Sequence, residues 1–280
     1  MFVAKELVFT ELHKTAGSHI GMLLANTLGG EQIGKHNRIP VELRSKFVLG
    51  SIRNPWDWYV SLWGYGCDGK GSVFFNTTRK NNALDSSNAL VREMFGSSLT
   101  PMLICRQWRH EQTKPTEIWQ SVYKDVDDVE GFRRWIRLMF SEERRFDIGE
   151  GFGNSPLSSR HGLLSYRFFK LFTGIDRQIY AKNFNTTMDG LTRVWENYGF
   201  INAFVKQESL EEDFINALML AGVTLSDTQQ TEIRKARENK TNTSSRKPSK
   251  EYYDEETANL IFDRERFIID KFSYDISDIF

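Results

Sequence analysis

The segment after the apolar run at residues 6–12 combines a lysine, two hydroxyl groups and a glycine within six positions. It reads Lys14, Thr15, Ala16, Gly17, Ser18 and His19. A helix N-terminus presents N–H groups without partners and a partial positive charge, so a small-residue loop that leads into one can bind phosphate or sulfate. Gly17 would let the backbone approach the anion, and Lys14 would add a mobile positive charge. The segment therefore predicts an anion-binding loop.

The order of residues in this loop bears on the kind of nucleotide it could bind. An ATP-binding P-loop has the order Gly-x4-Gly-Lys-Ser/Thr, with the lysine after the second glycine. Here Lys14 precedes Gly17. This order argues against a nucleotide kinase or another ATP-dependent enzyme. An ordinary strand-to-helix turn that contains a lysine is the alternative interpretation.

A second candidate group follows the apolar run at residues 47–52. Arg53 stands at the carboxyl end of this predicted strand, where α/β folds place their ligands, and Pro55 suits the first position of a helix that carries Ser61. A guanidinium group and a hydroxyl can both donate to one phosphate. The alternative is that Arg53 pairs with Asp57 and that Ser61 is a surface residue. Two anion-binding groups on neighbouring strand ends would suit a ligand with two separated anionic groups.

The elements that would position these groups alternate between strands and helices. We expect strands at residues 6–12, 47–52 and 201–207, with a short one before His36, and a helix directly after each of the two loops. Further helices are expected at 89–95 and 129–140, from a capping box of Ser209 and Glu212 through Leu220, and at 255–272. This pattern predicts an α/β fold with a parallel sheet flanked by helices. We expect a single domain over residues 1–280, with an α-rich insertion at 64–160 that shapes the acceptor side.

Composition limits the classes of partner. The 37 basic and 37 acidic residues balance, which gives no reason to expect binding to nucleic acid or to an anionic membrane. No stretch approaches the roughly 20 apolar residues that span a bilayer. The two cysteines suit a reducing compartment, so we expect a cytoplasmic protein.

Together, these motifs resemble those of the sulfotransferase superfamily, in particular its carbohydrate-type members. Residues 13–18 are similar to the 5′-phosphosulfate loop of that family, and residues 51–57 with Ser61 are similar to its 3′-phosphate motif. Residues 204–214 and the closing segment 239–274 are also similar to the family, whereas residues 64–160 are not. The residue His19 departs from the family pattern.

The resemblance implies a P-loop-like sheet and a donor, 3′-phosphoadenosine 5′-phosphosulfate (PAPS), with the 3′,5′-bisphosphate (PAP) as product. It implies that the segment from Lys14 to His19 binds the 5′-phosphosulfate. It also implies that a second set binds the 3′-phosphate, namely Arg53, Ser61, Ser245, Arg246 and Lys247. Transfer of a sulfuryl group depends on positioning and electrostatics, and Lys14 would neutralise charge on the bridging oxygen. No metal is required by this chemistry.

A base is needed to take the proton of the acceptor hydroxyl. His36 is the candidate, because a histidine titrates near neutral pH and related enzymes have a histidine or glutamate in about this region. A surface histidine beside Lys35 and Arg38 is the alternative. The other candidates are His13, which is expected to pack at the strand end, and two histidines of the unassigned middle, His110 and His161.

The expected reaction is in-line transfer of a sulfuryl group from PAPS to an acceptor hydroxyl of a carbohydrate or small metabolite. A protein that binds PAP or PAPS without catalysis is the first alternative, and a P-loop nucleotide kinase is the second. A nucleic-acid-binding module would depend on Arg234, Lys235, Arg237, Lys240 and the pair at 246–247. A solvated charged helix with a cofactor loop explains those residues more simply.

Overall fold

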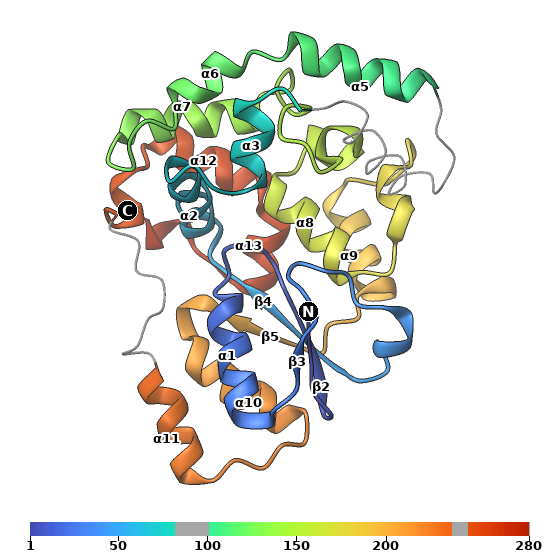
Figure 1. Cartoon of the computed structure of the whole chain (residues 1–280), viewed down its shortest axis with the longest axis vertical. Coiled ribbons are helices and arrows are strands. Elements are labelled where there is room, and N and C mark those ends of the chain that lie inside the picture. The colour runs from blue at the N-terminus through green and yellow to red at the C-terminus, as the bar shows by residue number, and fades with distance from the viewer. Residues whose placement is uncertain (82–100, 237–245, 280) are drawn as a thin grey trace. The chain divides into compact units, whose positions relative to one another are not determined.

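The computed structural model describes residues 1–81, 101–236 and 246–279, which form an α/β structure with one five-stranded sheet (Figure 1). The strand order is β3-β1-β2-β4-β5. The strands are β1 (Phe2–Val3), β2 (Leu7–Glu11), β3 (Glu31–Gln32), β4 (Phe47–Ile52) and β5 (Ala203–Lys206). The predicted α/β class is confirmed, and each of the three strands expected at 6–12, 47–52 and 201–207 is present.

The sheet is mixed, and the prediction of a wholly parallel sheet is wrong at one edge. Strand β2 pairs in parallel with β4, and β4 in parallel with β5. Strand β1 pairs antiparallel with β2 and with β3. A tight turn joins β1 to β2, and in it the N–H of Ala4 donates to the carbonyl of Leu7 at 2.9 Å. So short a connection permits only antiparallel pairing. The three strands that lead to the predicted site are the parallel ones.

The described residues also form helices before, between and after the last strands of the chain. These helices are α1 (Gly17–Leu28), α2 (Pro55–Cys67), α3 (Ser72–Thr78), α5 (Pro101–Thr113), α6 (Thr116–Ser121), α7 (Val129–Phe140), α8 (Leu163–Phe172), α9 (Met188–Tyr198), α10 (Leu210–Leu220), α11 (Asp227–Lys235), α12 (Glu255–Arg264) and α13 (Arg266–Phe272). The helix expected at 129–140 is confirmed with the same bounds. The helix expected at 89–95 lies outside the described residues. None of the described helices is both long and apolar enough to cross a membrane.

The chain divides into two compact units. The first, here called the sheet unit, consists of Met1–Asn54, Arg167–Gly174 and Arg193–Ser245. The second, here called the helical unit, consists of Pro55–Tyr166, Ile175–Thr192 and Arg246–Phe280. The described part of the helical unit contains helices and turns but no strand. Residues 64–160, expected to be rich in helix, belong to this unit and contribute α3, α5, α6 and α7 where they are described.

In the sheet unit, alternating side chains of the strands face two different layers. Leu7 and Phe9 of β2 pack with Leu49 of β4 against α1 and α10, which lie beside the sheet in Figure 1. Val8 and Val48 point to the opposite face, where they pack with Ile39 and with residues of the segment before β4. Because side chains of a strand alternate between faces, residue 11 shares the α1 face with residues 7 and 9. This alternation decides where the last side chain of β2 points.

The helical unit has an aromatic core. Trp63 on α2 contacts Phe132 of α7 and Tyr252, with ring centroids 5.4 and 5.6 Å away. The indole N–H of Trp63 donates to the carbonyl of Val122 at 2.9 Å, and that of Trp135 donates to the Tyr123 hydroxyl at 2.5 Å. Buried aromatic N–H groups of this kind usually have an acceptor, because an unpaired one would be costly. The seven tryptophans of the chain thus serve mainly as core.

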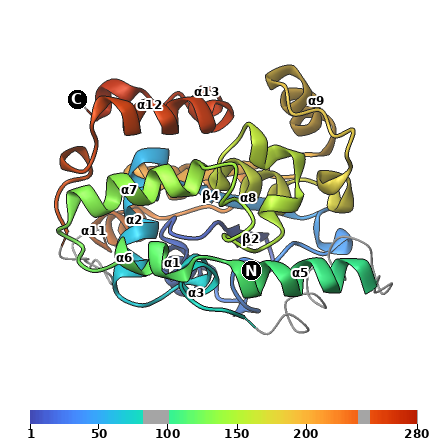
Figure 2. The ribbon, with the colours of Figure 1, turned by 90° about the horizontal axis from the view of Figure 1, so that it is seen from above.

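The closing segment forms two helices where one was expected at 255–272. α12 ends at Arg264 and α13 begins at Arg266, directly after it along the chain (Figure 2). The residue between them, Glu265, has a non-helical backbone and is completely buried. Its carboxylate is engaged by groups of two other elements, and these contacts draw the chain out of a continuous helix.

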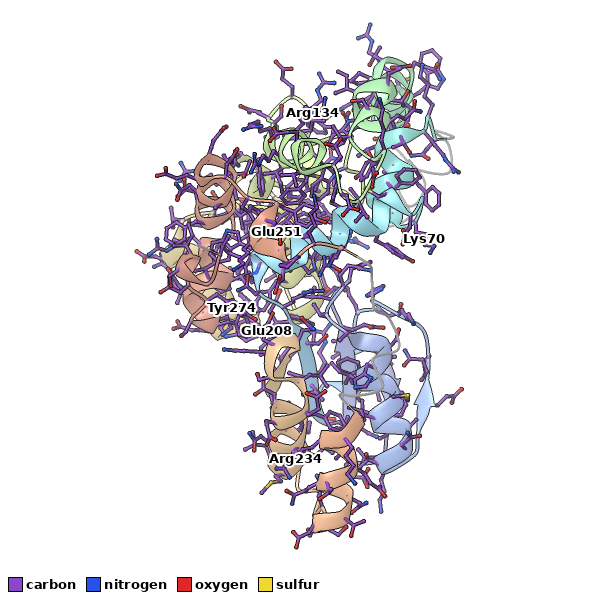
Figure 3. The ribbon with its side chains drawn as sticks, turned by 90° about the vertical axis from the view of Figure 1, so that its left-hand side faces the viewer. Lys70, Arg134, Glu208, Arg234, Glu251 and Tyr274 are labelled. Atoms are coloured by element: carbon purple, nitrogen blue, oxygen red, sulfur yellow. The ribbon has the colours of Figure 1, made fainter. Side chains whose placement is uncertain are left out.

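The capping box expected at the start of α10 is also wrong. The Ser209 hydroxyl donates to Asp213 at 2.7 Å and makes no cap bond, while Glu212 pairs with Arg234 of α11. Arg234 is labelled in Figure 3. Asp213 accepts in addition from the backbone N–H of Lys206 at 2.9 Å. The aspartate one position after Glu212 therefore receives the serine hydroxyl. The observed capping boxes are formed instead by Ser226 with Gln229 and by Asp254 with Thr257.

Candidate functional site

The loop between β2 and α1 has an unusual backbone. Lys14 and Ala16 have positive φ angles of 65° and 61°, while Thr15 between them does not. Alternating left- and right-handed residues turn successive N–H groups toward one side, which is the geometry of an anion-binding nest. Ala16 is the N-cap of α1 and has no side chain that could cap the helix. The first N–H groups of α1 are therefore available to an anion in a way that a serine or aspartate cap would prevent.

Thr15 serves to attach this loop to the sheet. Its hydroxyl is buried, 2.8 Å from the carbonyl of Leu12 and 2.6 Å from the hydroxyl of Ser51 on β4. A hydroxyl has one hydrogen to donate, so the Leu12 carbonyl takes it and Ser51 donates in return. The expected contribution of Thr15 to an anion is thereby limited to its backbone N–H. The contact holds the carboxyl ends of β2 and β4 together beneath the loop.

Gly17 is required by a neighbouring carboxylate. A Cβ atom added to Gly17 would overlap the side-chain oxygen of Glu11, the last residue of β2. Glu11 is only 4 % exposed. The sequence suggested that Gly17 lets the backbone approach an anion, and the structure shows the carboxyl group of Glu11 in the space that a side chain at position 17 would fill. Glu11 was not among the expected site residues. The alternation along β2 was the signal that could have found it, because it directs Glu11 to the α1 face.

Arg53 lies where expected, directly after β4, and its guanidinium reaches the loop. Its Nη1 atom donates to the carbonyl of Lys14 at 3.4 Å. The next residue, Asn54, donates its backbone N–H to Glu208, which precedes α10 (Figure 3), at 2.6 Å. The two groups that the sequence placed on neighbouring strand ends are thus in contact in the sheet unit through Arg53 and Lys14.

The segment after β3 approaches the same end of the sheet. Lys35 donates to the hydroxyl of Ser18 at 2.7 Å. His36 has a positive φ of 56°, and its ring stacks on that of His13 with 3.6 Å between centroids and 14° between planes. The expected packing of His13 at the strand end is observed, with His36 as its ring partner. The structure therefore brings His36 to the loop that carries Lys14.

The environment of His36 favours its neutral form. Burial lowers the pKa of His36 to about 4, the hydrogen bond to the Glu11 carbonyl opposes this, and the charges of Arg167 and Lys35 reinforce it. Nδ1 of His36 lies 3.2 Å from that carbonyl oxygen, which can only accept, so Nδ1 carries the hydrogen and Nε2 is the basic nitrogen. Arg167 is 1 % exposed and was not recognised from the sequence, where it stands within an apolar run.

His19 lies on the α10 side of α1. Burial lowers its pKa, and the charge of Glu211 opposes the shift. Its Nδ1 atom is buried and has no hydrogen-bond partner among the described residues. The charged group that acts on His19 is thus Glu211 of α10.

The helical unit carries the other residues expected to bind a 3′-phosphate. Ser61 is half-buried on α2, four positions after Asp57 and therefore on the same face of the helix. Asp57 accepts a hydrogen bond from Ser249 and raises the pKa of Arg246, although burial lowers that pKa more strongly. Nη1 of Arg246 is buried without a hydrogen-bond partner among the described residues. An N–H group in this situation is costly, and an anion would relieve the cost.

Of the two remaining residues expected to bind the 3′-phosphate, only one lies among the described residues. Lys247 donates to the carbonyl of Asp127 at 3.2 Å and is half-buried. Ser245 lies outside the described residues. The described residues expected to bind the donor thus belong to two units. Lys14 to His19 and Arg53 belong to the sheet unit, and Ser61, Arg246 and Lys247 belong to the helical unit.

The two histidines of the middle segment have local partners. Nε2 of His110 lies 3.2 Å from the carboxylate of Asp147, which also accepts from the indole of Trp119. Nε2 of His161 lies 2.7 Å from the carbonyl of Thr186, and burial lowers the pKa of His161. Both histidines belong to the helical unit.

Across the described residues, no group of three or more His, Cys, Asp or Glu side chains is arranged to hold a metal ion. Comparison of the chain with models of known protein families, with curated proteins and with solved structures finds no match.

Proposed function

We propose that this chain is a PAPS-dependent sulfotransferase that moves a sulfuryl group to an acceptor hydroxyl. The observation that carries the proposal is the loop in which Lys14 and Ala16 adopt left-handed backbone conformations, α1 begins without a side-chain cap, and Arg53 contacts the Lys14 carbonyl. This is an anion-binding arrangement at the carboxyl ends of two adjacent parallel strands. The resemblance of the sequence to sulfotransferases indicates that the anion bound by this loop is a phosphosulfate.

The residues have distinct roles in this proposal. The loop from Lys14 to Ser18 binds the 5′-phosphosulfate through backbone N–H groups, and Lys14 neutralises the charge that develops on the bridging oxygen. Arg53 and Ser61 bind the 3′-phosphate, with Ser245, Arg246 and Lys247 closing over it. The buried Nη1 of Arg246 supports this assignment, because a phosphate oxygen would supply an acceptor. We propose in addition that the fold is P-loop-like and that residues 1–280 form a single catalytic domain.

Transfer requires a base for the acceptor proton, and we assign this role to His36. The acceptor oxygen forms a bond to sulfur as the bond from sulfur to the bridging oxygen breaks, and the hydroxyl proton passes to the base. The Glu11 carbonyl fixes the hydrogen on Nδ1 and leaves Nε2 to receive that proton. The acceptor is a hydroxyl of a carbohydrate or small metabolite, and residues 64–160 select it. The protein acts in the cytoplasm in this proposal. No metal takes part.

A thermal-shift comparison tests the donor assignment. PAP should raise the melting temperature, because a ligand that binds only the folded state stabilises it, whereas ATP with Mg²⁺ should raise it less. Transfer of labelled sulfate from PAPS to a panel of glycans, phenols and lipids would then identify the acceptor class. A shift with ATP and Mg²⁺ but none with PAP would contradict the proposal and favour a P-loop kinase.

Arg53→Ala should weaken binding of PAP more than binding of adenosine 5′-phosphate, which lacks the 3′-phosphate. Loss of a charge-assisted hydrogen bond costs about 2 kcal/mol, so we expect PAP affinity to fall by about 30-fold. Calorimetric titration of both nucleotides with wild type, Arg53→Ala and Arg53→Lys measures the difference. Equal losses for the two nucleotides would show that Arg53 holds the loop through the Lys14 carbonyl and does not read the 3′-phosphate.

His36→Ala should lower kcat by about 100-fold or more with little change in PAP affinity. In the wild type, kcat/KM should fall as the pH decreases through about 4, because protonation of His36 removes the base. The variant should lose this acidic limb. A pH–rate profile of both proteins measures the effect, and an unchanged limb in His36→Ala would assign the base elsewhere.

A protein that binds PAP without catalysis is the second candidate. The burial of His36 favours it, because a pKa of about 4 describes a weak base. The two candidates give the same thermal shift with PAP and differ in the labelled-donor assay, where only the enzyme transfers sulfate.

A further inference from the structure

Building on the proposed function, we propose that Glu11 competes with the 5′-anion of the donor for the N-terminus of α1, so that the donor binds together with a proton. Glu11 would then set both the affinity of the loop for its anion and the pH at which the loop is filled.

The carboxylate of Glu11 lies against the first residue of α1. A Cβ at Gly17 would overlap it, so no side chain separates the carboxylate from the backbone there. The N-cap residue, Ala16, offers no competing oxygen, and helix N-termini attract negative charge. Glu11 therefore places a carboxyl group from β2 against the start of α1, where no residue caps the helix with its side chain. A donor anion seated on the loop from Lys14 to Ser18 would have this carboxyl group as a near neighbour.

The groups around Glu11 show how its charge is balanced in the ligand-free protein. Burial raises the pKa of Glu11, while the charges of Lys35 and of the N-terminal amine of Met1 oppose the shift. His36 faces the Glu11 carbonyl, and burial keeps that ring neutral. The neighbour of Glu11 on β4 is Ser51, which carries no charge. Both cations thus act on the Glu11 carboxyl through their charge. Lys35 also donates a hydrogen bond to Ser18 at the loop.

The sign of the effect follows from these charges. A second anion near Glu11 disfavours the carboxylate form, so the pKa of Glu11 rises further when the donor binds. Between the pKa of the free protein and that of the complex, binding takes up as much as one proton. Affinity then falls with increasing pH in that interval. In a partly buried site, repulsion between like charges is large enough to change affinity by about tenfold or more.

Calorimetric titration with PAP tests the inference. Affinities are measured at pH 6, 7 and 8, in two buffers with different enthalpies of ionisation at each pH, which gives the number of protons taken up. The variant Glu11→Gln keeps the shape of the side chain and removes its charge. The control is Glu31→Gln, which removes an exposed charge on β3 of the same sheet. A second variant, Glu11→Ala, separates loss of charge from any effect of the amide.

Glu11→Gln should bind PAP about tenfold more tightly than wild type at pH 8 and should take up fewer protons, while Glu31→Gln should match wild type. The difference between wild type and Glu11→Gln isolates Glu11, because the phosphates of PAP titrate in the same way with both proteins. Glu11→Ala should also bind more tightly at pH 8. Equal affinities and equal proton uptake in wild type and Glu11→Gln would overturn this inference while leaving the sulfotransferase proposal intact. Absence of PAP binding in every protein at pH 6 would overturn both.

Discussion

Replacing Lys14 with alanine should lower sulfuryl transfer by about 100-fold or more while the fold is retained. Loss of a single group that stabilises developing charge typically costs this much. The side chain lies in a loop and is half-buried, and the contact that joins the loop to Arg53 uses the backbone carbonyl of Lys14, which alanine keeps. Alanine also keeps a Cβ at the positive φ of this position, so the backbone cost is unchanged. The rate of labelled-sulfate transfer at saturating PAPS measures the effect.

Two variants serve as controls for Lys14→Ala. Lys14→Arg keeps the charge and should retain part of the activity, although a guanidinium differs in shape from an ammonium group. Lys5→Ala removes an exposed lysine of the same sheet unit and should leave the rate unchanged. Full activity of Lys14→Ala, with circular dichroism and melting temperature like those of wild type, would refute the assigned role.

Glu265→Ala should be the most destabilising single substitution among those considered for the helical unit. Glu265 accepts hydrogen bonds from the Tyr59 hydroxyl at 2.5 Å, from the backbone of Leu164 at 3.1 Å, and from the backbone and hydroxyl of Ser165 at 2.8 and 2.6 Å. It thereby satisfies the N-terminus of α8, and Tyr59 accepts from Leu163 beside it. Removing the acceptor leaves several buried donors unpaired, at a cost of about 4 kcal/mol or more.

The same carboxyl predicts a dependence of stability on pH. Burial raises the pKa of Glu265 to about 7, against the hydrogen bonds from Ser165 and Tyr59. Because the folded-state pKa lies above the unfolded value of 4.5, this group's contribution is fully present below pH 4.5 and is lost as the pH rises through about 7. By linkage the loss amounts to about 3 kcal/mol. Urea unfolding followed by tryptophan fluorescence at several pH values measures it.

Two matched variants make the Glu265 prediction specific. Glu265→Gln should be less destabilising than Glu265→Ala and should abolish the pH dependence between about 4.5 and 7, because an amide does not titrate. Glu256→Ala removes an exposed carboxylate of the adjacent α12 that pairs with Arg137, and such surface pairs contribute little. An Ala variant at position 265 that unfolds at the urea concentration of wild type would disprove the structural role of this carboxylate.

Local patterns were sufficient for the elements that carry the candidate site. The apolar run at 47–52 predicted β4 with its bounds, and the proline at 55 predicted the start of α2, because both signals act within a few residues. The small-residue loop predicted the entry into α1 in the same way. Arg53 could be placed beside Lys14 because adjacent parallel strands end at the same edge of the sheet.

Two errors concern side chains whose hydrogen-bond partners a periodic pattern does not specify. The helix expected at 255–272 is interrupted at Glu265, because that carboxylate binds the start of α8 about a hundred residues away. The capping box expected at Ser209 is absent, because Asp213 takes the serine hydroxyl together with the N–H of Lys206 at the end of β5. A periodic pattern contains no information about such partners.

The sequence by itself determined the α/β class, the strands that end at the candidate site, and a lysine-containing loop at a helix N-terminus, since these depend on residue type and spacing. Only the tertiary structure showed that Glu11 stands against Gly17, that His36 is stacked on His13 with a lowered pKa, and that Thr15 is bound to the sheet. The physical reason is that burial and charge in a site depend on which distant side chains share a small volume, and the chain must be folded before those neighbours exist.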